Sequence, residues 1–175
     1  MNIRRAEEKD IPRIIELLKQ VLQIHADIRP DIFISGTTKY TTDELVKMIN
    51  DDKKPIYVAV NGSDICVGYA FCQLQEQSVS NNTVPFKLLY IDDLCVDKEQ
   101  RGKHIGKALV LDCMKTARSL GFRILQFNAV VESNASARHL YESLGFHSLG
   151  TIPGGFLQSD GAYVNIVPYY ISLTE

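Results

Sequence analysis

The chain has 175 residues, an apolar fraction of 45%, a charged fraction of 23% and a formal net charge of −2. This length fits one domain with a sizeable core, and the near-neutral charge argues against binding of nucleic acid through its phosphates. Charged residues interrupt every apolar run of residues 1–18, which are not typical of a signal peptide, and no stretch reaches membrane-spanning length. We therefore expect a single cytoplasmic domain over residues 1–175, without a nucleic-acid or membrane partner.

The predicted secondary structure alternates between helical and strand periodicity. Apolar Ile11, Ile14, Ile15, Leu18 and Leu22 recur at helical spacing near the start. The order of elements predicts helices packed on a mixed sheet, an α/β protein of the α+β type. The predicted elements, in chain order, are a strand at 2–6, helices at 7–24 and 41–50, strands at 56–60, 65–76 and 86–97, a helix at 105–120, a strand at 122–131, a helix at 134–144, and strands at 146–150 and 162–173.

Capping residues mark two of these boundaries. Thr42 is expected to cap the helix at 41–50, because its hydroxyl and the acidic residues after it suit the open amides of a first turn. Gly121 is expected to end the helix at 105–120. The strand at 86–97 is the most apolar, so we place it centrally in the sheet.

The segment from Leu94 to Ala108 carries the most informative chemistry. A buried strand ends, a glycine-containing turn follows, and a helix begins. Such a turn directs several backbone N–H groups into one small space, and with the positive end of the helix these donors suit a phosphate. Arg101, Lys103 and Lys107 add positive charge. A plain glycine turn before a solvated basic helix is the competing interpretation.

Two common phosphate-binding motifs do not match this turn. A P-loop needs four residues between its glycines, followed by Lys and Ser or Thr. Here three residues lie between Gly102 and Gly106, and Ala108 replaces the hydroxyl. The dinucleotide fingerprint G-x-G-x-x-G is also absent. These departures disfavour a nucleotide-binding protein.

Two motifs lie about thirty residues apart in the second half of the chain. Residues 101–106 read RGKHIG, and residues 134–146 read NASARHLYESLGF. Together they resemble the GNAT superfamily of N-acetyltransferases, whose pyrophosphate loop reads Arg/Gln-x-x-Gly-x-Gly/Ala and whose second motif reads N-x-x-A-x-x-L-Y-E-x-x-G-F. The departure is His104, where the family usually has glycine. Both motifs in the family's order are more specific than either alone.

The resemblance implies the acyl-CoA N-acyltransferase fold, a mixed central sheet of about seven strands flanked by about four helices. In this family the central strand separates from its neighbour, and the pantetheine arm of acetyl-CoA pairs with the strand backbone, as in strand addition to a sheet edge. No metal is implied. By this resemblance the cofactor-binding residues are Leu94, Cys95, Val96, Arg101, Gly102, Lys103, His104, Ile105, Gly106, Lys107 and Asn134.

The resemblance also implies two residues that move protons. A typical amine has a pKa of about 10 and must lose a proton before it attacks, whereas the leaving thiolate is helped by an acid. Tyr141 matches the family's tyrosine acid, with core packing as the alternative role. Asp92 lies where the family often has an acidic base, and burial would raise its pKa and make it a better base. A structural carboxylate is the alternative, and His25 and Glu132 are weaker base candidates.

The amine acceptor is expected beside the N-terminal helices and the last strands, which set substrate choice in this family. His25, Arg29 and Asp93 are the substrate candidates, with local ion pairs as the alternative role of His25 and Arg29. The segment 153–155 suggests a turn or a mobile flap. Homodimers are frequent in the family, so a second copy of the chain is a candidate partner beside a small-molecule or peptide amine.

We therefore interpret the chain as an N-acetyltransferase that transfers the acetyl group of acetyl-CoA to a primary amine by direct attack in a ternary complex. No covalent cysteine intermediate is needed, although Cys95 lies near the expected thioester. The alternatives are a non-catalytic sensor that binds acyl-CoA and an enzyme that uses another acyl chain, such as succinyl.

Overall fold

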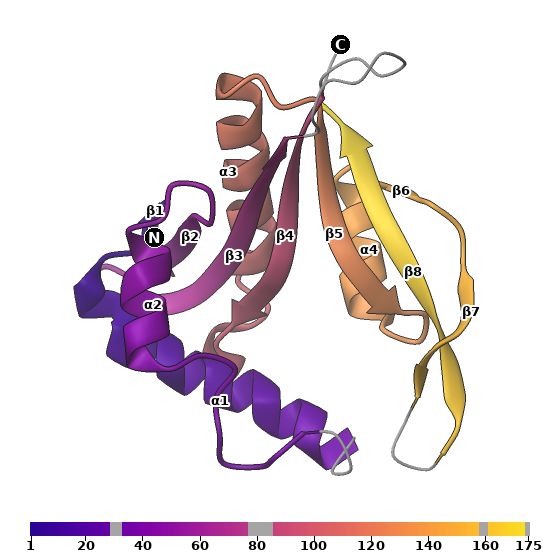
Figure 1. Cartoon of the computed structure of the whole chain (residues 1–175), viewed down its shortest axis with the longest axis horizontal. Helices are drawn as coiled ribbons and strands as arrows, with labels where there is room; N and C mark the ends of the chain where they lie inside the picture. Colours follow the sequence, from indigo (N-terminus) through magenta and orange to yellow (C-terminus); the bar gives the residue numbers. More distant parts are fainter. Residues whose placement is uncertain (29–32, 77–85, 158–160, 174–175) are drawn as a thin grey trace.

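The computed structural model describes residues 1–28, 33–76, 86–157 and 161–173. Its strands form one sheet in the order β1-β2-β3-β4-β5-β8-β6, with β7 paired to β8 (Figure 1). The pairing is antiparallel except between β4 and β5. The elements are β1 (Asn2–Arg5), α1 (Ile11–Ile28), α2 (Thr42–Ile49), β2 (Ile56–Val60), β3 (Cys66–Glu76), β4 (Lys87–Val96), α3 (Ile105–Ser119), β5 (Ile124–Val131), α4 (Ala135–Ser143), β6 (His147–Ser148), β7 (Ile152–Leu157) and β8 (Tyr163–Ser172).

The predicted fold class is confirmed, and Gly121 follows α3 with a φ of +73°, as expected of a helix-ending glycine. The predicted cap of α2 is one residue late. Thr41, not Thr42, accepts a hydrogen bond from the Glu44 amide at 3.3 Å, and the Glu44 carboxylate accepts one from the Thr41 amide at 2.7 Å. These two hydrogen bonds form a capping box, which needs a residue such as Glu three positions after the cap. Three positions after Thr42 lies Leu45, which is buried.

The sheet has one strand more than the sequence predicts. The turn expected at 153–155 lies inside β7, whose two ends pair with β8 across a shift in register. The segment therefore forms a bulge within a strand, which hides the period of two. A Cβ atom on Gly155 would lie 2.4 Å from Ile166 Cγ1, so only glycine allows this close approach of β7 to β8.

Helices cover both faces of the sheet (Figure 1). In β2, Ile56, Val58 and Val60 pack with α1 and α2, whereas Tyr57 and Ala59 pack with α3. This alternation has the period of two of a strand, and burial of both faces explains the continuous apolar run. Among the helices that the structure describes, none combines the length and apolarity needed to span a membrane.

Strands β4 and β5 separate partway along their length (Figure 1). Their parallel pairing joins residues 88–91 to residues 124–127 and ends there. At the same level a bulge in the β3–β4 ladder leaves Asp92 without a partner on β3, and β5 shifts register against β8 after Phe127. A bulge bends its strand and increases the local twist. The two strands therefore diverge towards their carboxyl ends.

Gly68 of β3 lies in close contact with both β4 and α3. A Cβ atom there would lie 2.9 Å from the Cys95 carbonyl oxygen and 3.3 Å from Ile105 Cγ2. We predict that Gly68→Ala lowers the free energy of unfolding by about 1–3 kcal/mol, as overpacking typically does, in urea denaturation. Gly62→Ala is the matched control, because a Cβ atom at Gly62 meets nothing within 4 Å. Equal effects of the two variants would contradict this account of Gly68.

Candidate active site

The turn between β4 and α3 holds its backbone in the left-handed region. Gly102 has a φ of +77° and His104 a φ of +58°. For a non-glycine residue this conformation costs about 1–2 kcal/mol, so His104 retains a backbone shape that suits glycine. Within the described part of the chain, no side chain caps the N-terminus of α3. The amides of its first turn are therefore available to an anion.

Helix α1 anchors this turn through two side chains that the sequence did not single out. The Gln20 side chain donates to the Val96 carbonyl at 3.4 Å and accepts from the Lys98 amide at 3.1 Å. Arg13 forms an ion pair with Asp97, which is buried. The partners of Gln20 lie 76 and 78 positions away along the chain. No local pattern signals such a contact.

The predicted cofactor residues of the turn fall into two groups. Ile105, the first residue of α3, is buried in the core between α3 and the sheet and anchors the turn there. A Cβ atom on Gly106 would meet the Val96 and Leu140 side chains at 3.7 Å, an ordinary contact, so the position has room for glycine or alanine. The remaining residues have exposed backbone or side chains: Arg101, Gly102, Lys103, His104 and Lys107.

The end of β4 has one unpaired edge. Residues 94–96 pair with residues 68–70 of β3, and the described β4–β5 ladder does not reach them. Their second edge can therefore accept a strand-like ligand. Burial raises the pKa of the Cys95 thiol to about 12, and the charge of Asp93 adds to this effect. The thiol therefore stays protonated at neutral pH, and a protonated thiol is a poor nucleophile.

Tyr141 of α4 is buried beside β5. Its ring stacks on that of Phe127 with centroids 4.0 Å apart. Burial raises the pKa of Tyr141, and the charge of Asp93 raises it further, so the phenol is protonated at neutral pH. The Asn134 side chain accepts from the Ala137 amide at 3.2 Å and caps α4, which helps to orient the helix that carries Tyr141.

The two predicted acidic residues of β4 have different partners. Asp92 forms an ion pair with Lys39 at 2.8 Å. Asp93 accepts a hydrogen bond from the Tyr69 hydroxyl at 3.2 Å. Burial raises the pKa of Tyr69, and the charge of Asp93 adds to the rise, so Tyr69 remains a donor. Lys39 and Tyr69 are thus the partners of these two candidate residues, and the sequence did not reveal them.

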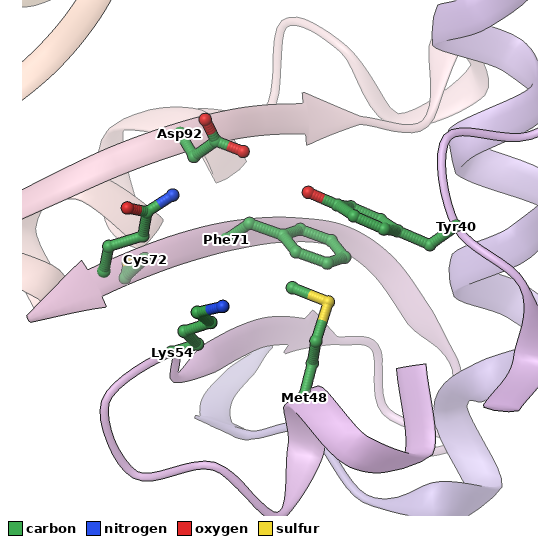
Figure 2. Close-up of a pocket in the computed structure, with 7 residues that line it drawn as sticks. Tyr40, Met48, Lys54, Phe71, Cys72 and Asp92 are labelled. Carbon is green, nitrogen blue, oxygen red and sulfur yellow. The ribbon is translucent and has the colours of Figure 1, made fainter. Parts of the chain in front are cut away.

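A pocket of about 100 Å³ lies beside Asp92 (Figure 2). The Tyr40 ring stacks on that of Phe71 with centroids 5.5 Å apart. In Figure 2, Met48 and Lys54 lie on the opposite side of the pocket from Asp92. The pocket thus combines aromatic walls with a carboxylate and an ammonium group. Its lining residues are Tyr40, Met48, Lys54, Phe71, Cys72, Gln73 and Asp92.

An open groove of about 660 Å³ lies between α1 and the β4–α3 turn. It carries charges of both signs, and Arg13 within it is already paired with Asp97. A ligand bound at the turn would therefore also lie beside α1. The lining residues are Arg13, Glu16, Lys19, Gln20, Gln23, Ile24, Asp97, Lys98, Glu99 and Arg101.

The remaining predicted residues are His25, Arg29 and Glu132. The side chain of His25 and the whole of Arg29 lie outside the described residues. The Glu132 carboxylate accepts from the Asn165 side chain at 2.9 Å, and Asn165 in turn accepts from the Gly154 amide at 3.2 Å. Glu132 thus connects the end of β5 to β8 and β7.

Sequence comparisons agree with this geometry. A family model described as the acetyltransferase (GNAT) family matches residues 18–146. YwnH of Bacillus subtilis (strain 168), provisionally named a phosphinothricin acetyltransferase, is 24% identical over 157 residues. The match covers 88% of this chain and 88% of YwnH.

Solved structures show the same fold. A GCN5-related N-acetyltransferase from Kribbella flavida has a TM-score of 0.75 and 25% identity, over 98% of this chain and 96% of that one. The yncA protein of Salmonella typhimurium, solved with its cofactor acetyl-CoA, has a TM-score of 0.75 and 19% identity, over 100% of this chain and 95% of that one. Because the family model spans most of the chain and the sheet separates beside the matched turn, the chain belongs to the GNAT family of acetyltransferases and is an acyltransferase.

Proposed function

We propose that this protein binds acetyl-CoA between β4 and β5 and transfers its acetyl group to a primary amine by direct attack. The observation that carries the proposal is the unpaired edge of residues 94–96 leading into the uncapped N-terminus of α3. A strand edge suits the amides of a pantetheine arm, and open helix amides suit a diphosphate. One ligand with both parts would span the two features.

The residues present fit this cofactor. The backbone from Arg101 to Lys107 would hold the diphosphate, with exposed cations beside it. Leu94, Cys95 and Val96 would hold the arm through their main chain. Asn134 would line the slot, which is the space between the separated ends of β4 and β5, from the start of α4. When bound, acetyl-CoA supplies an acyl group activated as a thioester. A backbone N–H of β4 that faces the slot would stabilise the oxyanion that develops on this group.

Two side chains would carry the acid–base roles. Tyr141 is a protonated phenol and would donate a proton to the leaving thiolate. Asp92 would accept a proton from the incoming ammonium group, since it lies at the bulge where the slot begins and beside the pocket. Asp93, held by Tyr69, would help to position the acceptor.

The amine acceptor would occupy the pocket beside Asp92, between α2, β3 and β4. Its small volume and mixed polarity favour a small-molecule amine or the end of a peptide. The provisional name of YwnH, a phosphinothricin acetyltransferase, supports trying amino-acid-like amines first. We further propose one domain over residues 1–175 in the cytoplasm, with a homodimer as the assembly to test.

The direct test is thiol release from acetyl-CoA on mixing with a panel of primary amines, alongside calorimetry with coenzyme A. Turnover with at least one amine is expected. Cofactor binding without turnover on any amine would instead favour the acyl-CoA sensor. Propionyl- and succinyl-CoA in the same assay test the acyl preference.

Variants of His104 test whether the backbone of the turn, rather than the imidazole, binds the cofactor. We predict that His104→Gly keeps the coenzyme A Kd within about threefold, because glycine adopts the left-handed region readily. His104→Val should raise the Kd about tenfold or more, because a β-branched residue is a genuine outlier there. Calorimetry measures both.

The control for backbone strain is Asp64→Val, at a position with the same φ of +58° away from the turn. It should lower stability and leave the Kd unchanged. If His104→Gly weakened binding as much as His104→Val, the imidazole would be the ligand and the backbone account would be wrong.

Tyr141→Phe tests the proton donor. We predict that turnover with any active amine falls about 100-fold or more, while the coenzyme A Kd changes less than twofold. The matched control is Tyr57→Phe, since Tyr57 is equally buried in the same core, 7% exposed, but lies on β2. The control should retain full turnover. A fully active Tyr141→Phe enzyme would remove Tyr141 from the mechanism.

A further inference from the structure

Lys39 occupies the place beside Asp92 where an acceptor ammonium group is expected. Its Nζ lies 2.8 Å from the Asp92 carboxylate and 5.3 Å from the centroid of the Tyr40 ring. A carboxylate and an aromatic face together are a typical site for an alkylammonium group. The chain therefore fills, with its own side chain, a site of the kind that a substrate amine would use.

Lys39 is also partly open to solvent. Its side chain is 44% exposed, and it projects from the connection that precedes α2 rather than from a packed element. The two residue steps from Asp92 to Leu94 along a strand span about 7 Å. A flexible four-carbon stem that already reaches Asp92 can sweep towards the strand segment where the thioester would lie.

We propose that Lys39 is an acetylation site of this enzyme's own active site. The inference rests on the proposed function, because it uses the same slot, base and acid. Asp92 accepts a proton from the Lys39 ammonium and releases it to solvent, and the neutral nitrogen forms a bond to the acetyl carbon. The same nitrogen then loses a second proton to Asp92, which releases it to solvent as well. The carbon–sulfur bond breaks, and the thiolate accepts a proton from Tyr141, which regains one from solvent. The products are acetyl-Lys39, coenzyme A and one released proton.

Acetylation would change the site that it modifies. The amide of acetyl-Lys39 carries no charge, so its ion pair with Asp92 is lost. Asp92 then becomes available to another ammonium group. An enzyme molecule that has modified itself would therefore bind a cationic acceptor more readily than one in which Lys39 remains charged.

Enzymatic and chemical acetylation are distinguishable at this residue. Burial disfavours the Lys39 ammonium, but the hydrogen bond and charge of Asp92 outweigh it and raise the pKa of Lys39. A lysine with a raised pKa has less free amine in solution and reacts slowly with acetyl-CoA on its own. Faster labelling of Lys39 than of the exposed Lys47 and Lys53 thus requires the active site.

The experiment incubates the full chain with acetyl-CoA and no added amine, and follows intact mass and peptide mass spectra. We expect one added acetyl group at Lys39, at least tenfold faster than at Lys47 or Lys53, at a rate independent of protein concentration. Lys39→Arg should abolish this labelling. Tyr141→Phe should slow it at least tenfold, and added Lys39→Arg enzyme should not restore labelling of the Tyr141→Phe chain.

Three results would overturn the inference. They are labelling of Lys54 in place of Lys39, equal rates of labelling at Lys39 and the exposed lysines, and no labelling at all. The control measurements separate this failure from that of the proposed function. If coenzyme A binds and an amine is acetylated while Lys39 stays unmodified, only the inference fails. If coenzyme A does not bind, the proposed function fails as well.

Discussion

The structure depends on the loss of pairing between β4 and β5 after Ile91 and Phe127. An unpaired strand edge inside a protein leaves backbone donors and acceptors that need other partners. Both neighbouring ladders are irregular at this level, one at Asp92 and the other beyond Phe127. The stacked rings of Phe127 and Tyr141 pack α4 against β5, so Tyr141 is part of the packing that supports the separated strand.

The same separation explains why α1 contributes polar side chains to the sheet. Gln20 satisfies the Val96 carbonyl and the Lys98 amide at the end of β4, and Arg13 neutralises the buried Asp97. These contacts hold the strand end and the following turn in one orientation. Open amides at a helix N-terminus bind an anion well only when they are fixed in advance, because ordering them on binding costs conformational entropy.

Charge at the site is balanced within the chain. Asp92 is paired with Lys39, and Asp93 is hydrogen-bonded to Tyr69. A buried carboxylate without such partners would be costly. Under the proposed function, an acceptor amine would therefore replace an internal partner of Asp92 rather than enter an empty site, and Lys39 would bear on acceptor choice as much as Asp92.

The elements and the family could be predicted from the sequence because their signals are local. Periodicity marks the strands and helices, Gly121 marks the end of α3, and the RGKHIG and NASARHLYESLGF motifs indicate the family. Strand β7 was not predicted from the sequence, because its bulge hides the alternation of period two. Only the tertiary structure decided that Gln20 supports β4 and that Lys39 meets Asp92, 53 positions away, because packing of the whole chain brings such residues together.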